Sequence, residues 1–255
     1  MNTIHIFILS IIEGLTEFLP ISSTGHLILA IKLLNIAETD FVKTFEVVIQ
    51  LGAILAVLVV YFKKLISSFT LIKKLIVAFI PTGIVGLIFF PFIKNFLGST
   101  VVTLNGLFWG GIAIIAVERF LPRKKDEIKK TNEVGYKQVL IIGIFQSLSV
   151  IPGVSRSAAT IIGGLLTGLN RSAATEFSFL LAIPTMLAAT GYIFYKSCSF
   201  IALGEVSILA VGIALSFLFA LLAIKLLLNY VKKHNFTLFG IYRIILSALF
   251  ALFVK

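Results

Sequence analysis

The sequence has little charge and one cysteine. Charged residues make up 13% of its 255 residues, about half of the roughly 25% found in soluble domains, which excludes a water-soluble globule and a disordered chain. A single cysteine forms no internal disulfide, which excludes a disulfide-stapled secreted domain. What the chain has in excess is hydrophobic residues, 59% of the total. This balance predicts an all-α polytopic membrane protein.

Six long apolar stretches reach or approach the roughly 20 residues that a helix needs to cross a bilayer. They are residues 44–62, 72–93, 100–121, 173–196, 203–229 and 237–254. The apolar run that starts at Ile4 lacks the pattern of a cleaved signal peptide, because no Lys or Arg precedes it and Glu13 and Glu17 interrupt it. We therefore expect the mature chain to begin near Met1 and to cross the membrane several times.

Two further apolar regions, 3–35 and 137–169, are interrupted by residues that break helices. The first is broken near Pro20–Ser23 and the second near Pro152–Ser155. Each half has about 13–16 residues, or about 20–24 Å of helix, which is short of a hydrocarbon core about 30 Å thick. We expect a re-entrant helix pair or a broken helix in each region. Such backbone is stable at membrane depth only where protein or a wet cavity surrounds it.

The two broken regions resemble each other in sequence. Residues 13–24 align with residues 146–157 when one gap is allowed, and each region is followed by three of the long spans. Because three is odd, the second copy of the unit must be inverted relative to the first, as in folds with a site at the membrane midplane. The prediction is a single integral membrane domain, 1–255, with repeat one at 1–121, a cytoplasmic linker at 122–136 and repeat two at 137–255.

The basic residues predict the orientation. Fifteen of them fall on one face under this topology and five on the other, so the first face is predicted to be cytoplasmic and both termini outside. The fifteen are Lys63, Lys64, Lys73, Lys74, Arg119, Arg123, Lys124, Lys125, Lys129, Lys130, Lys137, Arg171, Lys225, Lys232 and Lys233; the five are Lys32, Lys43, Lys94, Lys196 and Lys255. The net charge of +11 is thereby explained by topology, and we expect no nucleic-acid partner.

Seven ionisable residues lie inside apolar stretches, where a charge at a helix centre costs about 2.5–3.5 kcal/mol. They are Glu13, Glu17, His26, Glu46, Arg156, Glu176 and Arg243. For Glu46, Glu176 and Arg243, a structural ion pair between helices is as good an explanation as a functional site. Glu13, Glu17 and Arg156 lie at the two breaks, which favours a site.

The first break combines two carboxylates with helix-capping hydroxyls. Glu13 and Glu17 are four residues apart and face one side of a helix, and like charges so close favour a bridging cation. Carboxylate oxygens suit Mg²⁺ or Ca²⁺. Pro20 is expected to end this helix, and Ser22 and Ser23 are good N-caps for the next one, whose free N–H groups attract anions.

The second break combines a cation with hydroxyls. Ser155 is expected to cap the following helix, with Arg156 and Ser157 in its first turn and Thr160 about one turn on. The planar guanidinium of Arg156 suits phosphate oxygens. If the two breaks meet, carboxylates and a cation lie opposite an arginine and free amides. This arrangement suits a diphosphate, with one phosphoryl group to attack and one to hold.

At these residues the sequence resembles the undecaprenyl-diphosphate phosphatase family, also called the bacitracin-resistance phosphatases. Two motifs carry the resemblance, Glu13-Gly-Leu-Thr-Glu-Phe-Leu-Pro-Ile-Ser-Ser-Thr-Gly-His26 and Pro152-Gly-Val-Ser-Arg-Ser-Ala-Ala-Thr160. The stretches Lys43–Gly52, Glu176–Pro184 and Ile241–Arg243 are also similar to that family, so the resemblance covers essentially the whole chain. The second copy has Gln146 where the first has Glu13, so the carboxylate pair occurs once.

The resemblance implies hydrolysis of a C55 isoprenyl diphosphate to its monophosphate, which recycles the lipid carrier of cell-wall synthesis and confers bacitracin resistance. It implies a divalent cation as cofactor, a polyprenyl diphosphate lipid as substrate, and a site in the bacterial plasma membrane that opens to the outer face. The functional positions that it implies are Glu13, Glu17, Ser23, His26, Ser155, Arg156 and Thr160. We infer the roles: Glu17, Ser23, His26 and Arg156 for catalysis, Ser22, Thr24, Ser155, Ser157 and Thr160 for substrate binding, and Glu13 and Glu17 for the metal.

Several alternatives stay open at the level of sequence. Ser23 is the candidate nucleophile, activated by Glu17 or His26, while a metal-activated water that attacks directly is almost as good. A lipid-phosphate flippase or secondary transporter also has inverted repeats and midplane charges. The oligomeric state is open, and a homodimer is one candidate.

Overall fold

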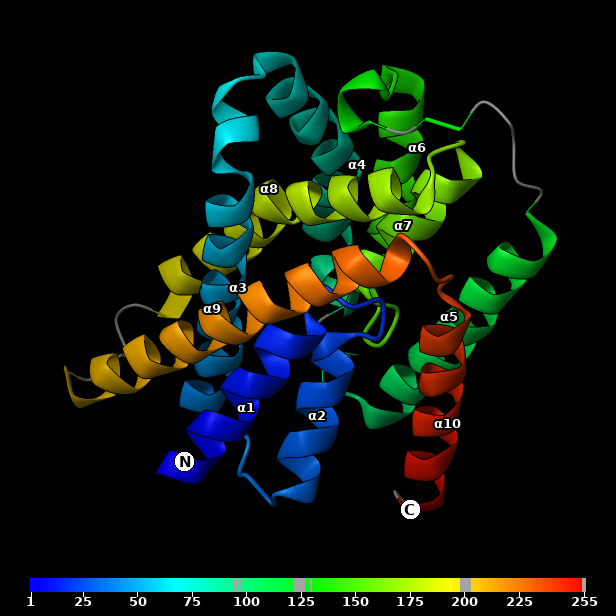
Figure 1. Ribbon diagram of the computed structural model, residues 1–255. Coiled ribbons are helices and arrows are strands. Elements are labelled where there is room, and N and C mark those ends of the chain that lie inside the picture. Colours follow the sequence, from blue (N-terminus) through cyan, green and yellow to red (C-terminus); the bar gives the residue numbers. More distant parts are fainter. Residues whose placement is uncertain (94–95, 97, 122–126, 129, 198–202, 254–255) are drawn as a thin grey trace.

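The computed structural model describes residues 1–93, 96, 98–121, 127–128, 130–197 and 203–253. Within these residues the chain forms α-helices joined by short turns, as predicted for an all-α membrane protein (Figure 1). A single isolated bridge between Ile128 and Leu169 is the strand-like pairing found there. Residues 122–126 and 129 of the predicted linker lie outside the described residues.

Both broken regions form helix pairs. The first consists of α1 (Thr3–Thr16) and α2 (Ser23–Leu33), joined by loop 1 (residues 17–22). The second consists of α6 (Tyr136–Ser147) and α7 (Arg156–Leu166), joined by loop 2 (residues 148–155), which holds one turn of 3-10 helix. With 14, 11, 12 and 11 residues, three of the four halves are shorter than the predicted 13–16. The expectation that Pro20 ends the first helix is wrong: α1 already ends at Thr16, and residues 17–21 form turns.

The six predicted spans are all helical. They correspond to α3 (Asp40–Ile66), α4 (Phe69–Ile93), α5 (Thr100–Phe120), α8 (Arg171–Ser197), α9 (Leu203–Val231) and α10 (Thr237–Phe253). The first five are long and apolar enough to cross a membrane. Helix α10 has only 17 residues, about 26 Å at 1.5 Å per residue, so the span predicted at 237–254 is a shorter apolar helix.

The two helix pairs enter the bundle from opposite ends. Figure 1 shows the N-terminus, the C-terminus and the connection between α2 and α3 at one end, and the connection between α3 and α4 at the other. Helix α9 packs on α1 and α3, helix α4 packs on α6 and α8, and α5 packs on α10. Helices α1 and α9 approach closely because Gly14 has no side chain: a methyl group there would lie 2.8 Å from Cβ of Phe219.

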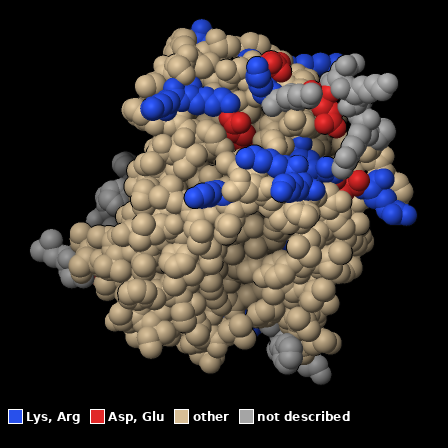
Figure 2. Space-filling view, viewed as in Figure 1, with Lys and Arg blue, Asp and Glu red and all other residues tan. Residues whose placement is uncertain are grey.

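Lysine and arginine gather at the end of the molecule opposite the termini (Figure 2). The described residues at this end lie in the last turns of α3 and α5, near the starts of α4, α6 and α8, and near the end of α9. Lys32 and Lys43 lie at the other end, in the last turn of α2 and the first turn of α3. The division of basic residues expected from the sequence is therefore present in the described part of the fold. Lys94, Arg123, Lys124, Lys125, Lys129 and Lys255 lie outside the described residues.

Candidate active site where the two loops meet

The two loops end in the same way. Ser22 and Ser155 have φ of 72° and 73°, a conformation that costs a non-glycine residue about 1–3 kcal/mol and is concentrated at functional sites. Each serine is an N-cap: Ser22 Oγ accepts a hydrogen bond from Gly25 N at 3.3 Å, and Ser155 Oγ accepts one from Ala158 N at 3.2 Å. As predicted, α2 and α7 therefore begin at capped N-termini that attract anions.

Glu17 joins the two loops by its carboxylate. Ser23 Oγ donates a short hydrogen bond to Glu17 Oε2, and Arg156 Nη2 donates to Glu17 Oε1 at 3.1 Å. The side chains of Glu17 and Arg156 are each 9% exposed, and Ser23 is buried as well. A hydroxyl bonded to a carboxylate that a third group orients is the arrangement of an activated nucleophile.

Arg156 is fixed in place but keeps one donor free. Its Nη1 donates to the carbonyl oxygen of Ser178 at 2.9 Å, and its guanidinium carbon lies 5.8 Å from the centre of the Phe18 ring. Its Nε is buried and has no hydrogen-bond partner in the described part of the chain. A buried N–H without an acceptor is uncommon in proteins, and this one suits a phosphate oxygen of a bound substrate.

The hydroxyl groups predicted to bind substrate make different contacts from one another. Ser157 Oγ donates to the carbonyl oxygen of Leu19 at 2.8 Å, which ties the first turn of α7 to loop 1. Thr160 Oγ1 donates to Ser178 Oγ at 2.6 Å and thus holds α7 against α8. Thr24 is exposed in the first turn of α2. Among the described residues, its side chain is not seen to bond any other predicted site residue. The structure thus groups Ser155, Ser157 and Thr160 by hydrogen bonds, while Ser22 caps its own helix and Thr24 is exposed.

Glu13 is fully buried, and both of its carboxylate oxygens lack a hydrogen-bond partner among the described residues. Its counterpart in the second pair, Gln146, is satisfied: Gln146 Nε2 donates to Thr82 Oγ1 at 2.8 Å, and Gln146 Oε1 accepts from Thr185 Oγ1 at 3.2 Å. A buried carboxylate without donors fits a bound cation or a proton.

A cation at this position has few protein ligands. No group of three or more His, Cys, Asp or Glu side chains suited to a metal occurs within the described ranges. Mg²⁺ is usually bound by one or two carboxylates together with substrate phosphates. The orphaned oxygens of Glu13, one helical turn before Glu17, fit a cation of that kind.

His26 is turned away from the predicted nucleophile. Its Nδ1 lies 2.7 Å from the carbonyl oxygen of Ser22, and its Nε2 lies 2.7 Å from the hydroxyl of Tyr242. Because a carbonyl only accepts, Nδ1 carries the proton and Nε2 accepts from Tyr242. Of the two bases that the sequence left open, Glu17 is the one in contact with Ser23.

Sequence reasoning assigned no site role to three residues that the structure places here. Ser178 and Tyr242 contact Arg156 and His26, and Arg243 donates to backbone carbonyls of both loops. Arg243 had been singled out as a buried charge, and Ser178 lies inside a family-like stretch. Their contacts were not predictable, because most of the acceptors are main-chain oxygens that look the same in every sequence.

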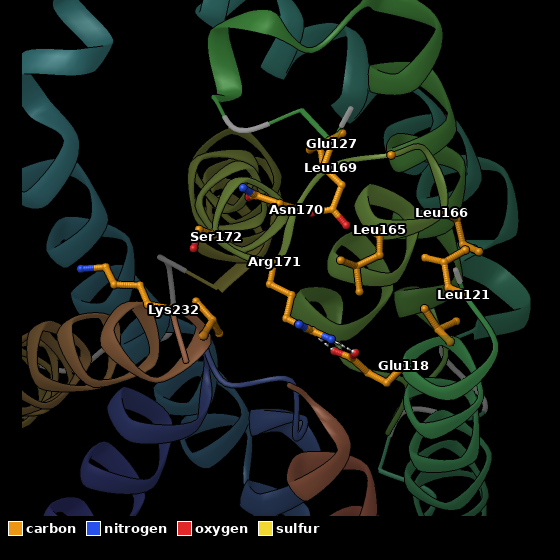
Figure 3. A pocket seen from close by; sticks show the side chains of 13 residues that line it. Glu118, Leu121, Glu127, Leu165, Leu166, Leu169, Asn170, Arg171, Ser172 and Lys232 are labelled. Carbon is orange, nitrogen blue, oxygen red and sulfur yellow. Dashed lines mark hydrogen bonds and ion pairs between the residues drawn. The ribbon is translucent and has the colours of Figure 1, made fainter. Parts of the chain in front are cut away.

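The remaining ionisable residues outside the loops include two helix-to-helix ion pairs. Glu176 pairs with Lys64 and accepts a hydrogen bond from Thr131 Oγ1, which is an ion pair between helices of the kind that the sequence allowed for. Glu118 pairs with Arg171 and also accepts from Phe236 N at 3.0 Å. This second pair lies in a cavity of about 250 Å³ at the basic end, where Figure 3 shows the two side chains facing each other. The predicted site residues are not among those that line it.

The chain matches known proteins over nearly its whole length. Residues 6–249 match the family described as bacitracin resistance protein BacA. The chain is 51% identical over 254 residues to a protein of Persephonella marina, with 100% of both chains covered, and 50% identical over 252 residues to one of Sulfurihydrogenibium sp., with 99% of both covered. It is 50% identical over 247 residues to one of Aquifex aeolicus, with 96% of each covered. Each of these relatives is named undecaprenyl-diphosphatase.

Proposed function

The chain belongs to the family of the bacitracin resistance protein BacA, and from this membership we propose that it is an undecaprenyl-diphosphatase. It hydrolyses the terminal phosphoric anhydride of undecaprenyl diphosphate, which gives the monophosphate and inorganic phosphate and returns the lipid carrier to cell-wall synthesis. The chain is a multi-pass membrane protein, so its lipid substrate reaches it within the bilayer.

The observation that carries the chemistry is the contact of Glu17 with both Ser23 and Arg156. In the first step Ser23 Oγ forms a bond to the terminal phosphorus while Glu17 accepts the hydroxyl proton. The bond from that phosphorus to the bridging oxygen breaks, and undecaprenyl phosphate leaves, taking up the proton from Glu17. In the second step a water attacks the phosphoserine and gives its proton to Glu17. Phosphate leaves, and the proton returns to Ser23 Oγ.

The groups around the nucleophile hold negative charge. Arg156 keeps a free Nε–H, and the capped starts of α2 and α7 present first-turn N–H groups that no helical carbonyl accepts. Charge on the transferred phosphoryl group is thus offset by a guanidinium and by two helix N-termini.

Glu13 and Glu17 are the residues that would hold a divalent cation, supported by the two orphaned oxygens of Glu13. Such a cation, Mg²⁺ or Ca²⁺, would neutralise diphosphate oxygens when bound. Glu17 also orients Ser23, so the same carboxylate would serve both the cation and the nucleophile.

We further propose that the two halves are inverted repeats and that the site opens to the outer face with both termini outside. Two observations support the repeat: the pairs α1–α2 and α6–α7 enter from opposite ends (Figure 1), and their loops end at serines of equal conformation. The collection of basic residues at the end opposite the termini supports the orientation.

The proposed function is tested with purified protein in detergent and a C15 or C55 isoprenyl diphosphate, by measuring released phosphate with and without EDTA. We expect release that EDTA abolishes and that added Mg²⁺ or Ca²⁺ restores. If no divalent cation supports any release, the protein is not a phosphatase, and a transporter becomes the better explanation.

A further inference from the structure

Arg243 of α10 is completely buried at the point where loop 1 and loop 2 meet. Its guanidinium donates to five backbone carbonyl oxygens, and in the described part of the chain it is not paired with a carboxylate. The acceptors are Pro20 O (3.2 Å), Gly153 O (2.8 Å), Val154 O (3.0 Å), Gly106 O (2.9 Å) and Leu107 O (3.2 Å). One side chain therefore holds both loops and α5 together.

The contacts with the loops lie directly beside the reacting groups. Val154 immediately precedes the cap Ser155, and Pro20 lies just before the cap Ser22. These caps begin the helices that carry Ser23 and Arg156 as their first residues. Any shift of loop 1 against loop 2 therefore moves Ser23 relative to Arg156.

A simpler contact would be enough to join α10 to α5. Ser247, one turn further along α10, does this with a single buried hydrogen bond to Leu104 O at 2.8 Å. A buried charge at membrane depth costs about 2.5–3.5 kcal/mol, so helix packing alone gives no reason for an arginine. What a guanidinium adds is a rigid plane of five N–H donors, which allows one side chain to bind carbonyls of three segments at once.

We propose that Arg243 is a positioning residue, which fixes loop 1 against loop 2 and so sets the place of Ser23 relative to Arg156. The proposal rests on the proposed function, because it assigns the two loops to one reaction. It predicts that a displaced guanidinium slows the chemical step more than it weakens the fold, since a misplacement of about 1 Å can cost about a hundredfold in rate.

Two variants disturb the guanidinium in different ways. Arg243→Lys keeps the charge but removes the planar fork. Gly110→Ala leaves the arginine itself unchanged but adds a methyl group that would lie 2.0 Å from Nη2 and 2.8 Å from Cζ of Arg243, so the guanidinium must shift. The matched control is Ser247→Ala, which removes a buried bond of the same helix pair without touching either loop.

The measurements are kcat and KM for phosphate release, together with hydrogen–deuterium exchange by peptide. We expect both variants to lower kcat by about a hundredfold and the control to stay within about threefold of wild type. We also expect exchange to rise in residues 17–25 and 150–158 but not in α3 and α9. Lysine that retains wild-type kcat, or exchange that rises equally in α3 and α9, would overturn the proposal.

The exchange measurement separates this proposal from the proposed function. If the wild-type protein releases no phosphate, the phosphatase assignment fails, whatever Arg243 does. In that case a rise in exchange confined to the two loops still supports the hold of Arg243 on them, and unchanged loops overturn it.

Discussion

Ser22 and Ser155 share one backbone conformation, with φ of 72° and 73°, although they lie in different halves of the chain. Each caps a helix of 11 residues, and each follows a buried polar residue, Glu13 or Gln146, at the same spacing in the sequence. The residue after each cap differs: Ser23 in the first half and Arg156 in the second. One backbone design thus presents a hydroxyl from one side and a guanidinium from the other.

Arg156 is expected to be the residue most sensitive to conservative change. Arg156→Lys keeps the charge but cannot bond Glu17 and Ser178 O while also offering a free Nε–H. Loss of one preorganised donor lowers kcat by a factor of about 10²–10³. We therefore expect kcat to fall by that factor, while the size-exclusion elution profile of the folded protein stays unchanged. The exposed residue Arg119 provides the control, and Arg119→Lys is expected to retain full activity. Near-normal turnover by Arg156→Lys would remove it from the site.

Ser23 decides between a serine nucleophile and a metal-activated water. Ser23→Ala removes the hydroxyl that donates to Glu17. If Ser23 Oγ attacks phosphorus, we expect phosphate release to fall to background, and rapid quenching of the wild-type protein to yield a phosphoserine. If Ser23→Ala keeps more than about a tenth of the activity, water is the nucleophile and Ser23 only positions the phosphate. Glu17→Gln should be as inactive as Ser23→Ala, because both lack the base–hydroxyl pair.

Glu13 is expected to govern the dependence on divalent cations. Glu13→Gln keeps the shape of the side chain but weakens its affinity for a cation. We expect the cation concentration for half-maximal activity to rise by at least about tenfold. Isothermal titration calorimetry without substrate should show the same rise in the dissociation constant of the cation. Glu133→Gln, at an exposed position on the 3-10 turn, is the control. An unchanged cation dependence in Glu13→Gln would place the cation elsewhere.

Tyr242 is expected to hold His26 in one tautomer. Tyr242→Phe keeps the ring that lies parallel to His26, with centres 5.6 Å apart, and removes only the hydroxyl bonded to Nε2. One such hydrogen bond contributes about 0.5–1.5 kcal/mol to stability, so we expect the free energy of unfolding in detergent to fall by about that amount. Nitrogen-15 spectra of labelled histidine should show a shift at Nε2 of His26. The exposed Tyr136→Phe variant should leave both readouts unchanged, and a silent spectrum for Tyr242→Phe would contradict the bond.

The breaks in the two helix pairs could be predicted from sequence, because Pro20, Pro152 and the capping serines act locally. The meeting of the two breaks was only a condition of the sequence prediction that carboxylates lie opposite Arg156. The structure meets that condition, because Arg156 bonds Glu17 from 139 residues away. Likewise the charge of Arg243 was visible, but its acceptors are backbone carbonyls that only the fold assembles. Properties that depend on a few neighbouring residues were predictable, and contacts between the two halves were not.

The conformation of the two caps gives a prediction about stability that is independent of activity. Ser22→Ala loses the cap, at about 0.5–2 kcal/mol, and keeps the cost of a positive φ. Ser22→Gly loses the same hydroxyl, but glycine at a cap costs only a few tenths of a kcal/mol and adopts positive φ freely. We therefore expect the glycine variant to have the higher melting temperature in detergent, although both variants lack the hydroxyl.

The same comparison at Ser155 tests whether the two loops are equivalent. If both halves use one backbone design, Ser155→Gly should exceed Ser155→Ala in melting temperature by about the same margin, about 1 kcal/mol or more when expressed as free energy. If glycine exceeds alanine in melting temperature at Ser22 only, then Ser155 is held by its neighbours and not by a shared turn. One such neighbour is Ser157, whose Oγ lies 3.2 Å from Ser155 Oγ. If the Gly–Ala difference in melting temperature is the same at both serines, the backbone turn alone sets both helix N-termini. The side chain that follows each cap, Ser23 or Arg156, then has no effect on it.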